Sequence, residues 1–506
     1  MSLASTLAVS LQGITGNIVT VEVDIADGIP SYTLLGLPDT ALSESRDRIR
    51  ASLVNCGEIW PHRKVTVSLS PAWLPKSGSS FDLAICVALI SANAALPSQR
   101  LEGIVLLGEL ALDGALRSVR GVLPSLIAAY ESGVTTAIVP SANAQEAALM
   151  SDMEIIALPH LRDVLHWLRT GERNIALEID LQWQENSPLL DFSDVAGQPL
   201  ARIAAEIAAT GGHHLLLIGP PGAGKTMIAE RLPTIMPALR LWQALEVTSV
   251  HSIAGSLTNR SPLSLVAPIV APHHTATRVA MVGGGAHAIK PGACSLAHHG
   301  VLFIDEAPEC GNGVLDSLRQ PLESGTITIA RNSGNLTLPA RFLLVLAANP
   351  CPCGKFSGRG LACTCTSVQV RRYLAKLSGP LLDRIDLKVH IDPVGRVDMA
   401  RNDLGESSDV IRARVIAARA VAAERFAGLS WQLNSQIPTR ALRTTFQLER
   451  GAMNFLHDEL EKERITARGL HKISRVAWTL ADLSGHDRPT RDDVERAYEL
   501  REGSQS

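Results

Sequence analysis

The chain has 506 residues, of which 46% are hydrophobic and 4% aromatic, and its formal net charge at pH 7 is −3. This hydrophobic share excludes a disordered chain, and at ~150 residues per domain the length predicts about three domains. Lys and Arg number 47 against 50 Asp and Glu, so no overall basic bias indicates nucleic-acid binding. Neither an apolar run of about 18 residues nor a signal peptide is found, and we expect a cytoplasmic protein without a membrane span.

The first third of the chain predicts a separate α+β domain over residues 1–172. The runs that indicate strands are Ile18–Val23 and Lys64–Leu69, and those that indicate helices are Ser43–Leu53 and Leu83–Ala92. The polar sequence that follows, including QWQENSP, predicts a linker over 173–191. We therefore expect this domain to fold apart from the rest of the chain.

The sequence GPPGAGKT follows an apolar run, Leu215–Ile218, and precedes a predicted helix. A glycine-rich turn between a buried strand and a helix presents backbone N–H groups to phosphate oxygens. We expect the whole turn to bind ATP; its residues are Gly219, Pro220, Pro221, Gly222, Ala223, Gly224, Lys225 and Thr226. Lys225 is predicted to neutralise the β- and γ-phosphates, and Thr226 is predicted to ligate Mg²⁺.

A second apolar run ends in two acids in VLFIDE, residues 301–306. Asp305 is predicted to hold Mg²⁺ together with Thr226, and Glu306 to polarise the water that attacks ATP. Alternating β and α patterns over residues 192–395 predict a parallel sheet covered by helices, and residues 405–502 are helical throughout. These features predict a magnesium-dependent ATPase with a C-terminal helical domain.

The run FLLVLAAN predicts a buried strand, Phe342–Asn349, whose last residue is polar. The Asn349 side chain is suited to sense the γ-phosphate or to orient the attacking water. Alternatively, Asn349 opens a turn with Pro350.

Two arginines are candidates for charge neutralisation at the γ-phosphate. Arg384 lies in GPLLDRIDL, just before another apolar strand, where a neighbouring subunit could receive it. The alternative is a salt bridge to Asp383 or Asp386. Arg468 begins a predicted helix, Ala467–Leu483, and either reaches the phosphates or is a solvated surface residue.

Four cysteines follow the predicted sensor strand in the spacing CxC, nine residues, CxC; they are Cys351, Cys353, Cys363 and Cys365. Four thiolates within residues 351–365 suit a tetrahedral structural Zn²⁺, although zinc knuckles usually have the spacing CxxC. The intervening GKFSGRGLA cannot bury a core, so the loop needs metal to hold a shape. Redox-active or unpaired thiols are the alternative. The other cysteines are isolated and predicted to be core or near-surface residues: Cys56, Cys86, Cys294 and Cys310.

Over nearly its whole length the chain resembles the AAA+ ATPases of the Mg-chelatase-like YifB/ComM type. The runs that carry the resemblance are GLPDTALSESRDRIR (36–50), SDVAGQ (193–198), GPPGAGKT, APHHTATRVAMVGGG (271–285), SLAHHGVLFIDEAPE (295–309), NPCPCG (349–354) and RRYLAKLSGPLLDRIDL (371–387). The resemblance implies that Asn349 is sensor 1, Arg384 the arginine finger and Arg468 sensor 2.

The same resemblance implies a homo-hexameric ring with ATP between subunits. It also implies an insert between Ser256 and Ala288 that projects toward the pore and includes Val282–Gly285. His273 and His274 belong either to this insert or to a packed structural pair. By resemblance the substrate is single-stranded or branched DNA, with helicase or branch-migration activity in recombination or natural transformation and recombination proteins as further partners. The alternative is a chelatase-like motor that remodels a protein partner.

The N-terminal domain resembles the Lon-protease-like, ribosomal-S5-type fold through PAWLPKSGSSFDLAICVALIS. The resemblance places Ser80 at the nucleophile position and Leu123 where the general-base lysine would stand. Without an amine of lowered pKa within reach, the Ser80 hydroxyl is inert. Lys76, four residues before Ser80, is expected to be exposed. The domain is therefore expected to be a scaffold or a DNA- or partner-binding domain.

Overall fold

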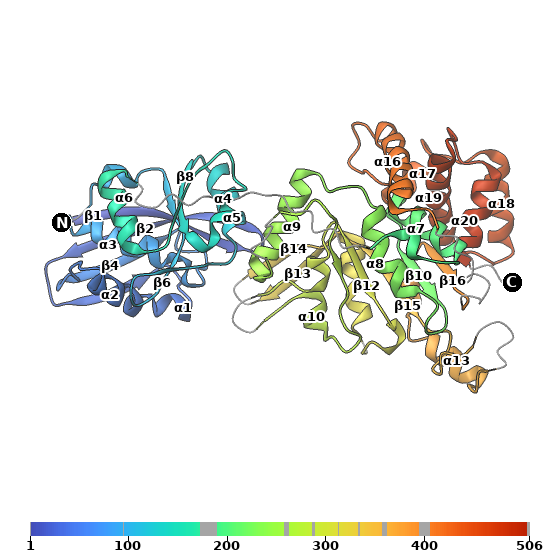
Figure 1. The fold of residues 1–506 in the computed structure, drawn as a ribbon, viewed down its shortest axis with the longest axis horizontal. Coiled ribbons are helices and arrows are strands. Elements are labelled where there is room, and N and C mark those ends of the chain that lie inside the picture. Colours follow the sequence, from blue (N-terminus) through green and yellow to red (C-terminus); the bar gives the residue numbers. More distant parts are fainter. Residues whose placement is uncertain are drawn as a thin grey trace.

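The structure is a computed structural model that describes residues 2–94, 96–172, 190–257, 263–285, 289–311, 313–331, 334–356, 362–393 and 405–502. Figure 1 shows the N-terminal region, residues 2–172, at one end, a central α/β region, and a cluster of C-terminal helices at the other end. The linker predicted over 173–191 lies outside the described residues except for its last two positions. Among the described helices, none combines the length and apolar composition of a bilayer span.

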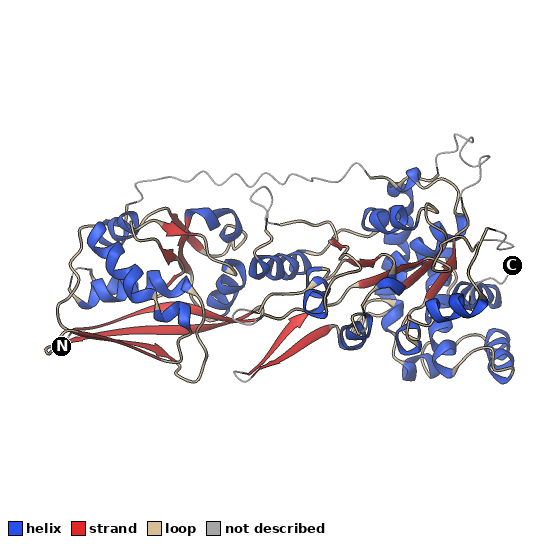
Figure 2. Ribbon diagram, turned by 90° about the horizontal axis from the view of Figure 1, so that it is seen from below, coloured by secondary structure: helices blue, strands red, loops and turns tan. Residues whose placement is uncertain are grey.

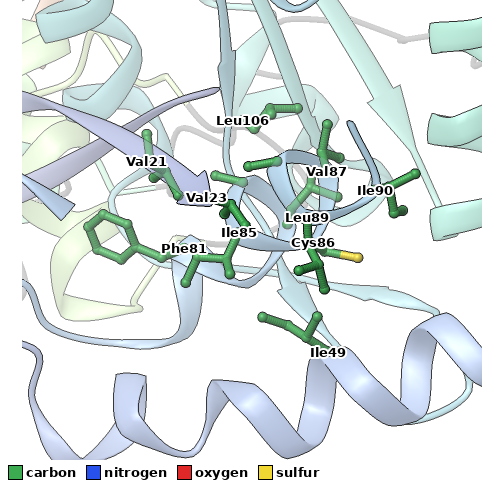
Figure 3. Packing of buried hydrophobic residues seen from close by; sticks show 14 of the residues in the cluster. Val21, Val23, Ile49, Phe81, Ile85, Cys86, Val87, Leu89, Ile90 and Leu106 are labelled. Atoms are coloured by element: carbon green, nitrogen blue, oxygen red, sulfur yellow. The ribbon is translucent and has the colours of Figure 1, made fainter. Parts of the chain in front are cut away.

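The N-terminal region is built on a seven-stranded mixed sheet in the order β3-β4-β2-β1-β5-β8-β9. Its strands are β1 (Ser2–Gln12), β2 (Thr15–Ala26), β3 (Ser31–Leu35), β4 (Lys64–Ser70), β5 (Ile104–Leu106), β8 (Thr136–Pro140) and β9 (Glu154–Leu158), beside a short hairpin of β6 (Glu109–Leu110) and β7 (Leu116–Arg117). The helices are α1 (Thr40–Ser43), α2 (Ser45–Asn55), α3 (Asp82–Ala92), α4 (Val122–Glu131), α5 (Ala144–Ala147) and α6 (Leu161–Thr170). Every residue of α3 is buried. Figure 3 shows α3 side chains between Val21 and Val23 of β2 on one side and Ile49 of α2 on the other.

The central region contains a parallel sheet in the order β11-β12-β15-β10-β16. Its strands are β10 (Leu215–Ile218), β11 (Ile269–Val270), β12 (Val301–Ile304), β15 (Leu343–Ala348) and β16 (Leu387–His390). Leu215 pairs with Val345 on one side and with Leu387 on the other, so the central strands run in step. All residues of β12 and β15 are buried, as expected for strands covered on both faces by helices.

Helices and a hairpin surround this sheet. The helices are α7 (Pro199–Gly211), α8 (Lys225–Ile235), α9 (Leu241–Ala254), α10 (Arg278–Val282), α11 (Ala293–Leu296), α12 (Arg319–Ser324), α13 (Ser367–Leu374) and α14 (Gly379–Leu382). The antiparallel hairpin of β13 (Thr326–Arg331) and β14 (Gly334–Pro339) points away from the sheet in Figure 2. Sequence reasoning missed this hairpin.

The C-terminal region is helical, as predicted. It consists of α16 (Ser408–Arg425), α17 (Thr439–Arg443), α18 (Arg450–Glu461), α19 (Ala467–Ser484) and α20 (Arg491–Glu502). Buried residues of α16 and α19 share one hydrophobic cluster with α7 and strands β10 and β16. The structure therefore has the predicted architecture: a parallel sheet core with a helical C-terminal region, preceded by an α+β domain.

The N-terminal region contacts the central region through a small buried polar network. Ser252, on α9 of the central region, donates its hydroxyl to the Glu146 carboxylate and accepts the backbone N–H of Gly121 at 2.9 Å. Glu146 also accepts the N–H of Leu123 at 2.8 Å, and burial raises the pKa of its carboxyl group. These bonds attach α9 to the loop before α4.

The structure describes only part of the range between Ser256 and Ala288, where the pore insert was expected. Residues 258–262 and 286–288 lie outside the described residues. Within the range, Ile269–Val270 is strand β11 and pairs with Val301 and Leu302 at the edge of the sheet. Val282 packs on the core cluster instead of projecting from it. Val270 also packs against this cluster, whereas Ile269 is 37% exposed, and the projection of the insert toward a pore stays a prediction.

Candidate functional site

The turn between β10 and α8 has the backbone of a phosphate-binding loop. Gly222 and Gly224 have φ angles of +79° and +89°, in the left-handed region that favours glycine. A Cβ on Gly219 would lie 2.4 Å from the carbonyl oxygen of Ile391, just past β16, so only glycine fits there. The loop precedes the N-terminus of α8, where free N–H groups attract anions.

The Lys225 ammonium lies inside this loop. Its Nζ donates to the carbonyl oxygens of Gly219 at 2.6 Å and Pro220 at 2.9 Å, and to Oδ1 of Asn349 at 3.2 Å. Burial lowers the pKa of Lys225, although Asp305 and Glu306 act in the opposite direction. Phosphate oxygens in the loop would replace neutral acceptors by charged ones, which bind an ammonium more strongly.

Thr226 and the acids after β12 meet at the same edge of the sheet. Thr226 Oγ1 donates to Asp305 Oδ2 at 3.0 Å, and the backbone N–H of Glu306 donates to Asp305 Oδ1 at 2.8 Å. A hydroxyl and a carboxylate are hard oxygen ligands, so this pair fits Mg²⁺ held in part by nucleotide phosphates. Glu306 itself has φ +49° and a half-exposed side chain.

The structure brings His274 to Glu306, a contact that sequence reasoning missed. His274 Nδ1 lies 3.1 Å from Glu306 Oε2. The neighbouring His273 ring lies with its centroid 4.1 Å from that of His274, and Nδ1 of His273 is 2.8 Å from the Thr275 hydroxyl. The two histidines are therefore stacked on each other beside Glu306, in the segment between β11 and α10.

The two predicted arginines lie at the opposite end of the sheet. Arg384 donates to Glu323 on α12 and to the carbonyl oxygen of Pro380, and Arg468 Nη1 is 3.5 Å from Asp383. Because Leu387 and Leu215 begin two strands in register, residues 383–386 lie at the amino ends of the strands. The phosphate loop follows the carboxyl ends, about 13 Å away for a four-residue strand.

We call the edge with residues 219–226 the phosphate end and the edge with Arg384 and Arg468 the arginine end. The structure places Arg468 with Arg384 and apart from the phosphate loop of its own chain. For Arg384, the observed partner is Glu323, whereas the sequence had suggested Asp383 or Asp386.

A buried charge pair holds the arginine end. Asp386 accepts Lys472 Nζ at 2.7 Å and the N–H of His214 at 3.0 Å, and Lys472 also donates to the carbonyl oxygen of Arg384 at 2.8 Å. Burial raises the pKa of Asp386, but Lys472 and His213 outweigh this and hold it well below its ordinary value. His214 Nδ1 accepts the N–H of Leu344, which connects this pair to β15.

The four predicted zinc cysteines converge. Cys351 Sγ lies 3.3 Å from Cys353 Sγ and 3.7 Å from Cys363 Sγ, and the sulfur of Cys365 belongs to the same group, all within 4.8 Å. A tetrahedral Zn²⁺ with Zn–S bonds of ~2.3 Å requires sulfurs about 3.8 Å apart, close to this spacing. A backbone N–H of Lys355 and the Cys351 thiol lower the pKa of Cys353 to about 6, which favours its thiolate. The backbone N–H of Cys365 also lowers the pKa of Cys363, but desolvation and the Cys353 thiol outweigh it and raise that pKa to about 12. The donor set fits zinc.

A second group of ligand-type side chains does not fit a metal. Glu246 Oε2 lies 3.1 Å from His298 Nε2 and 2.7 Å from His299 Nε2. However, His298 Nδ1 accepts the N–H of Arg341, so in the neutral ring Nε2 carries the proton and has no lone pair for a cation. Hydrogen bonds from the two histidines lower the pKa of Glu246 to about 2. The group is a hydrogen-bonded network.

A cleft of about 360 Å³ lies between α7 with its preceding turn and the start of the lid. Its walls include Val195, Gly197 and Ile411. The next residue, Gln198, donates to the carbonyl oxygen of Ala223 in the phosphate loop at 3.2 Å. The cleft is therefore adjacent to the phosphate loop, and sequence reasoning had not assigned it.

The predicted exposure of Lys76 is wrong. Lys76 is only 1% exposed, and its Nζ donates to the carbonyl oxygens of Leu69, at 2.9 Å, and Pro71. Burial lowers its pKa. Leu123 is fully buried on α4. This position therefore supplies an apolar side chain to the core and not a general base.

The fold and these residues define the class of the protein. A parallel sheet with a phosphate loop after β10 and two acids after β12 places the chain among the P-loop AAA+ ATPases, with a helical lid. Its parts match known families in the same order: "Subunit ChlI of Mg-chelatase" over residues 21–143, "Magnesium chelatase, subunit ChlI" over 191–399, and "Magnesium chelatase, subunit ChlI C-terminal" over 405–501.

Full-length relatives define the family more closely. An uncharacterized protein of Mycobacterium tuberculosis (strain H37Rv) is 45% identical over 502 residues, 99% of each chain. The uncharacterized protein YifB of Escherichia coli K12 is 40% identical over 99% of this chain and 97% of its own. Competence protein ComM of Haemophilus influenzae is 39% identical over 96% of this chain and 94% of its own. The chain belongs to the YifB/ComM-type, magnesium-chelatase-like family of AAA+ ATPases, a family that implies ATP and Mg²⁺.

Proposed function

We propose that the protein is a magnesium-dependent ATPase whose complete site forms between neighbouring subunits of a ring. The observation that carries this proposal is the division of the site between two ends of one sheet. Lys225, Thr226 and Asp305 meet at the phosphate end, whereas Arg384 and Arg468 lie together at the arginine end. A second copy that presents its arginine end to the first copy's phosphate end supplies the missing positive charge.

Each residue at the phosphate end has a role in this proposal. Lys225 neutralises the β- and γ-phosphates, and Thr226 and Asp305 hold Mg²⁺. Glu306 orients and polarises the attacking water. Asn349, 3.2 Å from Lys225 Nζ, contacts the γ-phosphate or the water. Once ATP is bound, the Lys225 ammonium exchanges its carbonyl partners for phosphate oxygens.

The cleft beside α7 is the proposed site of the adenine base. Its volume of about 360 Å³ suits a flat heterocycle, and its lining combines apolar residues such as Ile203 and Ile411 with charged ones such as Arg202. Gln198, next to the wall of the cleft, donates to Ala223 of the phosphate loop. An adenine base in the cleft therefore places the phosphates of the same nucleotide in the loop. The cysteine cluster is the proposed site of a structural zinc ion.

The proposed boundaries of the parts are those expected from the sequence. They are an N-terminal domain over 1–172, a linker over 173–191, the ATPase core over 192–395 with the zinc loop 351–365, and the lid over 405–502. We propose a homo-hexamer in the cytoplasm, because a ring lets every copy use both ends of its sheet.

Single-stranded or branched DNA is the proposed substrate, with helicase or branch-migration activity in recombination or natural transformation. Its support is likeness: the Haemophilus influenzae relative is named a competence protein. The second candidate is remodelling of a protein partner, supported by the match to the magnesium chelatase subunit family.

The test measures ATP turnover by purified protein with Mg²⁺ across a range of protein concentrations. Turnover that rises with assembly supports a shared site, and turnover by isolated monomers would contradict it. Unwinding of a forked or four-way DNA substrate, with ATPase stimulated by DNA, favours the DNA motor. ATPase stimulated only by a protein partner favours the second candidate.

A further inference from the structure

The cysteine cluster lies directly against the phosphate loop. Gly354, in the turn after Cys353, is buried, and a Cβ added to it would lie 2.8 Å from Cδ of Pro221. Its φ of +72° also favours glycine. The same chain segment begins at Asn349, whose Oδ1 accepts Lys225 Nζ. Both ends of this short segment therefore touch the nucleotide-binding loop.

The segment after the cluster contacts the other acidic motif. Helix α13 follows the last cysteine and contains Tyr373, which is buried against Glu309. Lys376, just past the helix, pairs with the Glu309 carboxylate at 3.6 Å. Glu309 lies three residues after Glu306. The cluster thus stands between two contacts, one with the phosphate loop and one with the segment after the catalytic acids.

Between these two contacts, all described residues of 352–356 and 362–366 except Gly354 are exposed or half-buried. Of the cluster's sulfurs, only that of Cys351 is fully buried, and the described residues around it, such as Lys355 and Phe356, are exposed. Bonds from one metal ion to four thiolates fix all four chain positions at once, and such bonds are often the main source of stability in small loops.

We propose that metal bound to the four cysteines is a brace that sets the position of the phosphate loop, with Gly354 as the positioning residue. This inference rests on the proposed function of the loop and of the cluster. It predicts that removal of the metal weakens nucleotide binding even though no cysteine touches the nucleotide. Gly354 acts through Pro221 and is not a catalytic residue.

The first experiment measures the zinc content of the full-length protein and its affinity for a fluorescent ADP analogue before and after chelation. We expect about one zinc per chain and a Kd that rises about tenfold on chelation and returns when Zn²⁺ is added back. Tight zinc binding with an unchanged Kd after its removal would overturn the brace. Absence of zinc from the protein as purified and after Zn²⁺ addition would overturn it as well.

The second experiment separates the contact from general stability. Gly354→Ala should keep its zinc, raise the KM for ATP about tenfold and leave kcat close to wild type, because the methyl group displaces Pro221. Gly428→Ala is the matched control: its φ is +80°, but a Cβ there meets nothing within 4 Å. Equal KM values in the two variants would contradict the inference. Loss of ATP turnover in the wild type would instead contradict the proposed function.

Discussion

The two ends of the five-stranded sheet hold their functional side chains in different ways. At the phosphate end, side chains that follow strands β10, β12 and β15 contact one another within one chain, as in the Thr226–Asp305 and Lys225–Asn349 pairs. At the arginine end, the Arg384 guanidinium donates to two groups of its own chain, the Glu323 carboxylate on α12 and the carbonyl oxygen of Pro380 on α14. One end is assembled by folding within one chain, whereas the other, in the proposed ring, acts in the site of a neighbouring chain.

The largest expected effect separates binding from chemistry at the phosphate end. Lys225→Ala should abolish nucleotide binding, because the ammonium lies within the loop. Glu306→Gln should bind ATP normally and lower turnover by about 10²-fold or more, because the amide cannot polarise water. Calorimetry and a phosphate-release assay measure the two effects, with exposed Lys462→Ala as the control. Equal loss of binding in both variants would contradict the assigned roles.

The next effect tests the arginine end. Arg384→Ala should bind ATP as the wild type does and lower kcat by about 10³-fold. Mixing it with Lys225→Ala protein should restore part of the turnover, because some interfaces then join an intact phosphate end to an intact arginine end.

Arg412→Ala, on the exposed face of α16, is the matched control and should keep wild-type kcat. Failure of the mixture to regain activity, although both variants assemble, would show that Arg384 does not complete a neighbour's site.

A smaller effect concerns the stability of the arginine end. Asp386→Asn leaves Lys472 buried without its charge partner and should lower the free energy of unfolding by about 3–5 kcal/mol. The pKa of Asp386 lies below its ordinary value of 3.8, so the stabilisation is complete above that pH and is lost as the pH falls through the folded-state pKa.

Urea unfolding at several pH values measures this dependence, with the exposed Asp409→Asn as the control. A wild-type advantage over Asp386→Asn that persists unchanged well below pH 3 would be inconsistent with the ion pair, as about pH 3.8 is where an unpaired carboxyl protonates.

The smallest expected effect concerns the stability contributed by Glu246, whose carboxylate contacts His298 and His299 just before β12. Hydrogen bonds lower the pKa of Glu246 from 4.5 to about 2, but its side chain is 40% exposed, so solvent screens the interaction. Glu246→Gln should cost about 1 kcal/mol or less at neutral pH, and the difference should shrink as the pH falls from 4.5 toward 2. Thermal unfolding of Glu246→Gln measures this loss of stability, with the exposed Glu230→Gln as the control. A Tm of the wild type that rises with Zn²⁺ but does not rise in Glu246→Gln would instead indicate a metal site at this group.

Local sequence patterns predicted the phosphate end well. Glycines before a lysine, and acids after an apolar strand, leave few alternative structures, and parallel strands bring their carboxyl ends together. The four cysteines are close in sequence, so their convergence needed little knowledge of the tertiary fold. The helical lid was predictable from apolar spacing.

Features that depend on docking between distant segments were not predictable. Nothing local in Arg468 says on which side of the sheet α19 packs, and nothing in His274 says that the chain returns to Glu306. Lys76 was expected to be exposed because lysines usually are, but its buried Nζ donates hydrogen bonds to two backbone carbonyl oxygens. The β13–β14 hairpin had a readable signal in TITIA and NLTLP around NSG, which was overlooked.

The hydrogen bonds between Ser252, Gly121 and Glu146 have a mechanical consequence. They connect α9, the helix next to the five-stranded sheet, to the N-terminal region through polar groups that are buried from water. Separation of the N-terminal and central regions would break these buried hydrogen bonds, which opposes hinge motion between the two regions at this point. A rotation of α9 relative to the rest of the central region would therefore move the seven-stranded sheet of the N-terminal region with it.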